Sequence, residues 1–451
     1  MATPCRRRSI ARAAVVACLV MATGGLLAAP APARERAVAT GGDRSAKVFD
    51  PSFVHDVAFA VAPENVGLLR AGDSTRVPAT MVFDRVTVDQ IGLRLKGGYA
   101  SARELDDKPG FSVKTDEYVD GQSIFGIERF TLGNSISDHS FVSEQLSYDV
   151  WRAAGIPAPR TALANVTFNG ERFGLYVIRE GYDKSFLRRH FSDPDGNLYE
   201  SSIADVDMSD QLMEARTNED TNDKSDIAAL AQVVENTPDD QYVAGVGPLV
   251  DLDEVFKYWA VEAIVAHFDG YLAGTNVPFG NTDPTIVIGN DWTNNYFTYH
   301  DPRSDKFVVL PHGADWSMGG AIGLVGLRGG NTDPQYLDEA VLGGARFRTL
   351  SVPKPGARTI ARFTGLPGTE DRLRRNVLWA LKRAWNTRKL LARADKIAEL
   401  VRANGPPTSR EEWTRESFEE VFSRRRTFVE NRVAEVRAEL GLPAGGGEGS
   451  R

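Results

Sequence analysis

The sequence of 451 residues predicts an α+β fold, with a β-rich first half and a helix-rich second half. In the first half, short runs such as Val54–Val61 and Val86–Lys96 alternate apolar and polar side chains, as half-buried strands do. In the second half, apolar residues recur at helical spacing over four segments, which are 251–268, 369–386, 387–403 and 409–440. We therefore expect a strand-rich lobe followed by a helix-rich lobe.

Seven strands and one helix are predicted in the first half. The strands are, in chain order, Val54–Val61, Arg76–Phe83, Val86–Lys96, Phe111–Thr115, Arg129–Leu132, Thr161–Phe168 and Arg172–Arg179. Pro78 cannot donate a backbone hydrogen bond, which predicts an edge position for the second strand. Asn169-Gly170 predicts a tight turn that joins the last two strands as a hairpin. The helix is predicted over Asp138–Ala154, with Asp138 or Ser140 as its cap and Gly155 as its stop.

The second half begins with an acidic, polar segment over residues 201–249. It predicts an irregular and partly mobile insertion with one helical patch at Ile227–Val234. A helix and then a long polar loop over residues 277–293 follow. Two short strands, Tyr296–Tyr299 and Phe307–Leu310, precede the three closing helices.

The first 33 residues have the features of a secretory signal peptide. A positive start at Arg6-Arg7-Arg8 is followed by an apolar run from Ala13 to Ala29 and by the small residues Ala31-Pro32-Ala33, which predicts cleavage after Ala33. Whether export follows the general or the twin-arginine route stays open. Residues 34–47 predict a flexible linker and residues 441–451 a Gly-rich disordered tail, which leaves one domain over residues 48–440.

Composition narrows the class of function. Cys5 and Cys18 both lie in the predicted signal peptide, so the mature chain would have no disulfide, thiolate metal site or cysteine nucleophile. Cleavage would also remove four arginines and no acids, which takes the net charge from −8 to −12. Such an acidic chain argues against nucleic acid as a main partner. No segment after residue 33 is long and apolar enough to span a bilayer.

Three polar residues at the edges of apolar runs carry the strongest chemical indication. Asp269 follows a predicted helix, Asn295 opens a predicted strand, and Asp315 follows the next strand. This is the order of a kinase active site, in which the first Asp accepts the proton of the attacking hydroxyl and the other two residues hold the metal that bridges the nucleotide phosphates. Asn276, between Asp269 and Asn295 in the sequence, is a rival for the role of Asn295.

Other candidates for nucleotide contacts lie in the first half. Lys108 and Lys114 flank a predicted strand, and either could contact phosphates if it were oriented by Glu144 of the predicted helix. Glu180 follows an apolar strand, where the hinge of a two-lobed kinase would hold adenine. The segment RLKGGYAS over residues 94–101 ends a strand with paired glycines, whose backbone N–H groups could approach a phosphate or simply form a turn.

These segments in this order resemble the CotH kinase family. The matching pieces include IGLRLKGGYAS, VTFNGERFGLYVIREGYDKSFL, VFKYWAVEAIVAHFDGY and NNYFTYHDPRSDKFVVLPHGADWS, and the resemblance covers roughly residues 48–440. It implies an atypical bilobal protein-kinase-like fold that binds ATP and a divalent metal, Mg²⁺ or Mn²⁺. Many members have two acids at the last motif, whereas His312-Gly313-Ala314-Asp315 keeps one.

The resemblance also implies a role for each candidate. Lys108 fits the nucleotide lysine, Glu144 its helix partner and Glu180 the hinge acid, while Asp269 fits the catalytic residue. The two remaining candidates, Asn295 and Asp315, fit the metal ligands.

The expected function is therefore a secreted kinase that phosphorylates Ser or Thr of extracellular or spore-coat proteins. Two alternatives stay open, which are a non-catalytic cell-surface or spore-coat protein with the same fold and a carbohydrate-associated module.

Overall fold

The computed structural model describes residues 43–72, 75–97, 101–201, 213–267, 270–271, 294–319 and 366–443. The predicted signal peptide and the end of the predicted tail lie outside these ranges, and both stay predictions. The α+β class is confirmed, because strands dominate the described chain up to Glu180 and helices dominate it after Leu252. Among the helices that the structure describes, none is both long and apolar enough to cross a bilayer.

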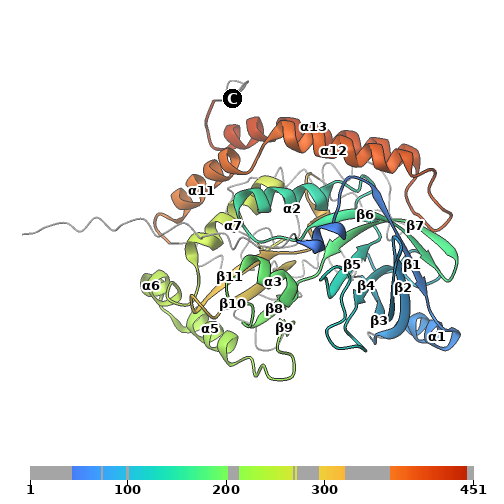
Figure 1. The fold of residues 1–451 in the computed structure, drawn as a ribbon. Coiled ribbons are helices and arrows are strands. Elements are labelled where there is room, and N and C mark those ends of the chain that lie inside the picture. Colours follow the sequence, from blue (N-terminus) through green and yellow to red (C-terminus); the bar gives the residue numbers. More distant parts are fainter. Residues whose placement is uncertain are drawn as a thin grey trace, which may run out of the picture. The chain divides into compact units, whose positions relative to one another are not determined.

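Seven strands in the first half close into a barrel in the order β1-β2-β3-β4-β5-β7-β6, which Figure 1 shows in blue to green. They are β1 (Val54–Ala60), β2 (Val77–Phe83), β3 (Val86–Lys96), β4 (Gly110–Lys114), β5 (Arg129–Gly133), β6 (Thr161–Phe168) and β7 (Glu171–Glu180). All neighbours are antiparallel except β1 and β6, which pair in parallel and close the barrel. The interior is apolar, with Phe111 at 0% exposure among Phe59, Phe168 and Phe173.

The predicted edge position of the second strand is wrong, because β2 pairs with both β1 and β3. Its pairing with β1 ends at Thr80, so Pro78 lies in a part of β2 that has β3 as its only ladder partner. The register also shifts between Ala79 and Met81. A proline is therefore tolerated because this end of the strand is locally an edge.

The helix predicted over Asp138–Ala154 begins later, as α2 (Ser143–Ala154). Phe141, just before the helix, has a φ of 60°, which a helix does not allow. Asp138 still acts as a cap from a distance, because its carboxylate accepts the backbone N–H of Ser143 at 2.8 Å. The turn at Asn169-Gly170 is confirmed, with positive φ at both residues.

A second sheet has the order β11-β10-β8-β9. Its strands are β8 (Leu198–Ser201), β9 (Met213–Ala215), β10 (Tyr296–Asp301) and β11 (Lys306–Pro311). The acidic segment predicted as irregular is more regular in its described part, which contains α5 (Ser225–Asn236), a 3₁₀ turn η3 (Asp239–Gln241) and α6 (Tyr242–Val246). The apolar residues Ile227, Leu230 and Val234 explain this, because they form one buried face of α5.

The remaining helices are α1 (Pro63–Ala71), α3 (Lys184–His190), α7 (Leu252–Val265), α11 (Thr369–Arg383), α12 (Thr387–Ala403) and α13 (Arg415–Glu439). Two 3₁₀ turns, η1 (Arg44–Lys47) and η4 (Ala314–Trp316), complete the described elements. Residues 43–47, the described part of the predicted linker, are ordered, because η1 buries Ser45 and Asp43 pairs with Arg160 at 3.0 Å. One continuous core joins α2, α7, α11, α12 and α13.

Candidate functional site

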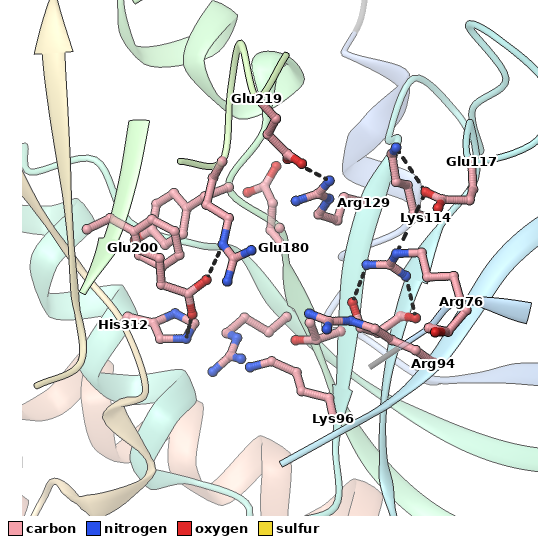
Figure 2. Close-up of a pocket in the computed structure, with 18 residues that line it drawn as sticks. Arg76, Arg94, Lys96, Lys114, Glu117, Arg129, Glu180, Glu200, Glu219 and His312 are labelled. Atoms are coloured by element: carbon pink, nitrogen blue, oxygen red, sulfur yellow. Dashed lines mark hydrogen bonds and ion pairs between the residues drawn. The ribbon is translucent and has the colours of Figure 1, made fainter. Parts of the chain in front are cut away.

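A polar pocket of 460 Å³ lies against the outer face of the barrel (Figure 2). Residues of β3, β4, β5 and β7 line one side, and Figure 2 shows Glu200 and His312 across from Arg94 and Arg76. Its cations are Arg76, Arg94, Lys96, Lys114, Arg129, Arg179 and Arg216, and its acids are Glu117, Glu180, Glu200 and Glu219. The excess of cations suits an anionic ligand.

Strand register explains why these side chains gather. Arg94 of β3 lies opposite Ser112 of β4, Ser112 opposite Thr131 of β5, and Thr131 opposite Arg179 of β7. Most of their chain neighbours are apolar and point into the barrel, so this row points outward. Four adjacent strands therefore present one row of polar groups to the pocket, with an arginine at each end.

Two of the cations have no protein partner in the described chain. The Nε atom of Arg94 is buried without a hydrogen bond, and no hydrogen bond or ion pair is formed by the ammonium group of Lys96 among the described residues. Burial and the nearby Arg179 lower the pKa of Lys96 to about 8. The hydroxyl of Thr131, on β5 in the same pocket wall, is also buried without a partner among the described residues. Unsatisfied buried donors of this kind favour a ligand that supplies oxygen atoms.

The other cations are partly neutralised by acids of the pocket. Arg216 contacts Glu200 and Glu214, both at 2.6 Å. Lys114 contacts Glu117 at 2.9 Å, so this candidate lines the pocket but already has a partner. The cations best placed to receive a ligand are therefore Arg94 and Lys96.

Glu144 of α2 pairs with Arg179, whose Nη1 atom lies 2.6 Å from Oε1 of Glu144. Burial opposes the charge of Arg179, but the Glu144 carboxylate raises the pKa of this guanidinium above its ordinary value. The pairing that we predicted between Glu144 and Lys108 is therefore wrong, because the two residues have different partners. Their individual roles in nucleotide binding stay predictions.

Lys108 lies outside the pocket lining. Its Nζ atom is 3.0 Å from Oε1 of Glu411 and donates to the backbone oxygen of Leu175 at 2.8 Å, and both charged side chains are 1% exposed. Burial lowers the pKa of Lys108 to about 8, although Glu411 acts in the opposite direction. This contact joins the barrel to the segment before α13.

Glu180 ends β7 and lines the pocket, as a hinge residue would. Its carboxylate is fully buried and accepts hydrogen bonds from Arg160 at 2.7 Å and Arg189 at 2.6 Å. Two arginines therefore already use the Oε1 atom of Glu180 in the pocket wall. Its role as an adenine contact stays a prediction.

Three rings form the least polar part of the pocket lining. Tyr182 packs against Phe297 with ring centroids 4.4 Å apart, and Phe297 contacts His312 at 5.0 Å. Burial and the nearby arginine Arg179 hold the pKa of His312 well below its ordinary value, so this imidazole is neutral at pH 7. A flat, neutral group of a ligand would fit best here.

The structure brings the predicted metal ligands into neighbouring segments. Gly313 has a φ of 53°, and a Cβ atom on it would lie 2.3 Å from the amide oxygen of Asn295. Because Gly313 has no side chain, the Asn295 amide can lie against its backbone. Gly313 comes two residues before Asp315 in the sequence. The negative charge of Asp315 also acts on Lys96 and Arg179, where it favours the charged form of each side chain. An amide and a carboxylate oxygen are hard ligands, so this pair fits a magnesium-type ion.

Asp269 and Asn276 lie outside the described residues, and the roles predicted for them stay predictions. Within the described ranges, no three His, Cys, Asp or Glu side chains come together as a metal cluster.

Sequence reasoning missed the two cations that the pocket leaves unpaired. It selected the segment RLKGGYAS for its glycines, whereas Arg94 and Lys96 of the same segment face the pocket. Their spacing of two residues at the end of a strand is the pattern that could have identified them, because such residues share one face.

The chain is 22% identical over 259 residues to inner spore coat protein H of Bacillus subtilis (strain 168). That match covers 55% of this chain and 64% of the relative, which is less than two thirds of its length.

Two solved structures are similar over much of the chain. The Helicobacter pylori proinflammatory kinase CtkA matches with a TM-score of 0.31 and 11% identity, over 74% of this chain and 94% of that one. HipA, HipB and operator DNA from Shewanella oneidensis MR-1 form a complex in which one chain matches with a TM-score of 0.27 and 11% identity, over 70% of this chain and 58% of that one.

A family comparison covers more of the sequence. The profile described as CotH kinase protein matches residues 93–436, which include the pocket cations from Arg94 onward and both Asn295 and Asp315. The chain therefore belongs to the CotH kinase protein family.

Proposed function

We propose that this protein is a secreted atypical kinase that transfers the γ-phosphate of ATP to Ser or Thr hydroxyls of extracellular or spore-coat proteins. The observation that carries the proposal is a pair of pocket cations, Arg94 and Lys96, that have no partner among the described residues, in a chain from a kinase family. Lys96 has Asp315, the candidate metal ligand, as an electrostatic neighbour.

The pocket supplies what a nucleotide triphosphate requires. A guanidinium can donate two parallel hydrogen bonds to a phosphate, and an ammonium group acts as a compact charge, so Arg94 and Lys96 suit different phosphoryl oxygens. Arg179 is held by Glu144, which keeps that carboxylate from pairing with Lys96. The rings of Tyr182, Phe297 and His312 would contact the base.

In the proposed reaction, the acceptor hydroxyl attacks the γ-phosphorus of ATP. A new P–O bond forms, the bond from that phosphorus to the β–γ bridging oxygen breaks, and ADP leaves with the bond's electron pair. Asp269 would accept the hydroxyl proton, as the family resemblance implies. Asp315 and Asn295 would hold a divalent cation, which would neutralise charge on the phosphates when bound.

Secretion and the class of acceptor rest on other observations. Residues 1–33 predict a cleavable export signal, and the curated relative is a spore coat protein by name. We therefore place the acceptor among extracellular or spore-coat proteins. The alternative is a non-catalytic coat or surface protein of the same fold, and the experiment below separates the two.

The test follows transfer of label from γ-labelled ATP, with Mg²⁺ or Mn²⁺, to the protein itself and to a Ser-rich acceptor. Lys96→Met, Asp269→Ala and Asp315→Ala are the variants, and Lys184→Met is the matched control because Lys184 pairs with Asp195 outside the pocket. The kinase proposal is supported if the parent and the control transfer the label and the three variants do not. Label that persists in Asp315→Ala would exclude the assignment of that residue. No label and no rise in melting temperature with ATP would favour the non-catalytic alternative.

A further inference from the structure

Two arginines of the C-terminal helix α13 are buried, although most of its other charged residues are partly or fully exposed. Arg425 is 1% exposed and Arg432 is 3% exposed. They are seven residues apart, which is about two helical turns, so they lie on one face roughly 10 Å apart. A buried guanidinium is costly unless its donors are used, so the groups that these two arginines contact are informative.

Arg432 contacts the C-terminal end of α7. Its Nε atom donates to the backbone oxygen of Ile264 at 2.9 Å, and Nη2 donates to that of Ala263 at 2.7 Å. The last carbonyl groups of a helix have no partner within the helix and carry a partial negative charge, so a guanidinium stabilises them well. The next carbonyl, that of Val265, accepts the backbone N–H of Met318 at 2.8 Å. The end of α7 thus contacts Arg432 through the carbonyl groups of Ala263 and Ile264. It contacts the segment after η4 through the carbonyl group of Val265.

Arg425 contacts the first residue of α2. Its Nε atom donates to the hydroxyl of Ser143 at 2.9 Å and lies 3.7 Å from Oδ1 of Asp138, whereas its two Nη atoms are buried without a hydrogen bond among the described residues. The backbone oxygen of Ser143 accepts the Ser317 hydroxyl at 3.3 Å. Ser143 directly precedes Glu144, and Ser317 comes two residues after Asp315. The start of α2 and the segment after η4 therefore meet beside Arg425.

A third residue of the same face completes the support. Phe428 lies between the two arginines in sequence, and a Cβ atom on Gly319 would lie 2.9 Å from its ring. Gly319 has a φ of 78° and follows Met318 directly. Side chains from one face of α13 therefore contact the end of α7, the start of α2 and the chain that leaves η4.

We propose that Arg425 and Arg432 are positioning residues, through which α13 sets the location of Asp315 relative to Glu144. This inference rests on the proposed kinase function. Neither arginine lines the pocket, so neither would touch the nucleotide. Their effect would act through the segment Ala314–Gly319, which is tied to α7 and α2 by the hydrogen bonds of Met318 and Ser317. Displacements of about 1 Å at a catalytic group lower rates by about 100-fold, so even a small shift should be measurable.

The experiment compares Arg432→Gln and Arg432→Lys in the full chain. Arg424→Gln is the matched control on the same helix, because Arg424 is partly exposed and pairs with Glu420 within the helix. Val401→Ala is the control for stability alone, because Val401 is buried in α12. For each protein, kcat, the KM for ATP, the melting temperature and the hydrogen exchange of the Met318 amide are measured.

We expect Arg432→Gln to lower kcat by about tenfold or more with the KM for ATP unchanged, and to accelerate exchange at Met318. Arg432→Lys keeps the positive charge but cannot donate in the bidentate geometry of a guanidinium, so it should recover part of kcat. Arg424→Gln should change nothing. If Arg432→Gln does not fold, Arg432→Lys and the equivalent Arg425→Lys carry the same comparison.

Two results would overturn the proposal. The first is unchanged exchange at Met318 in the folded Arg432 variants. The second is a loss of kcat in Val401→Ala as large as that of an Arg432 variant with the same melting temperature. If the parent protein has no kinase activity at all, the proposed function fails, whereas the exchange measurement still decides whether Arg432 holds this segment.

Discussion

Lys108 and Glu411, which lie 303 residues apart in sequence, form a buried ion pair with 3.0 Å between Nζ and Oε1. Glu411 also accepts the backbone N–H groups of Leu175 and Thr408 and the indole N–H of Trp413. A Cβ atom on Gly174 would lie 2.3 Å from this carboxylate, so the barrel leaves space for it. The contact links β7 to the segment that leads into α13, and its expected contribution is to stability.

Replacing Glu411 by Gln should lower the free energy of unfolding by about 3 kcal/mol, because it leaves the Lys108 ammonium buried without a counter-charge. Urea denaturation measures this change. The matched control is Glu412→Gln, since Glu412 is 43% exposed and pairs with Arg103 near the surface. That substitution should cost less than about 1 kcal/mol. Equal losses in the two variants would contradict a special role for Glu411.

Nucleotide affinity should depend on pH through Lys96. Its pKa of about 8 lies below the ordinary 10.5, so the ammonium loses its proton near pH 8 and an anion loses one contact. The dissociation constant for ATP should therefore rise between pH 7 and pH 9. Calorimetric titration with ATP measures it, and the rise should vanish in Lys96→Met and in Lys96→Arg, which stays charged. A rise of the same size in Lys96→Met would assign it to another group.

The same shift makes a prediction for stability with a definite sign. Because the folded pKa of Lys96 is below the unfolded value, the unfolded chain binds more protons between about pH 8 and 10.5. The contribution of Lys96 to the free energy of unfolding should therefore increase over this range, and be least favourable below pH 8. Thermal melts of the parent and of Lys96→Met over this range test the difference.

The sequence predicted the elements well but only part of the site. Strand alternation identified β1 and β6 within a residue, because half-buried strands show a period of two. It could not show that β3, β4, β5 and β7 lie side by side, since register between distant strands depends on the closed barrel. For that reason the row from Arg94 to Arg179 could not be foreseen.

The wrong pairing of Lys108 with Glu144 has a similar cause. Lys108 and Glu144 were matched by their order along the chain, and order does not reveal that Glu411 and Arg179 are closer partners. Asn295 and Asp315, by contrast, flank the hairpin of β10 and β11, whose antiparallel pairing brings the residue before β10 near the segment after β11.

Gly313 should be necessary for the geometry around Asn295. In Gly313→Ala, the new methyl group would lie 2.3 Å from the Asn295 amide oxygen, which must then move away from the Asp315 segment. Affinity for Mn²⁺ in the presence of ATP should fall, as measured by electron paramagnetic resonance. Gly72→Ala is the matched control, because Gly72 has a φ of 70° but no atom within 4 Å of the added carbon. If both variants bind Mn²⁺ like the parent, Asn295 is not a metal ligand.

Arg179 should protect Lys96 from Glu144. In Arg179→Gln, the Glu144 carboxylate loses its partner at 2.6 Å, and its charge already acts on Lys96. We expect the two to pair, which would withdraw Lys96 from the phosphates and weaken ATP binding by about tenfold, in line with the loss of a charge-assisted hydrogen bond. The double variant Arg179→Gln/Glu144→Gln frees Lys96 again, so it should bind ATP more tightly than Arg179→Gln alone. Additive losses in the double variant would mean instead that Arg179 and Glu144 contact the nucleotide independently, because only a shared effect on Lys96 gives recovery.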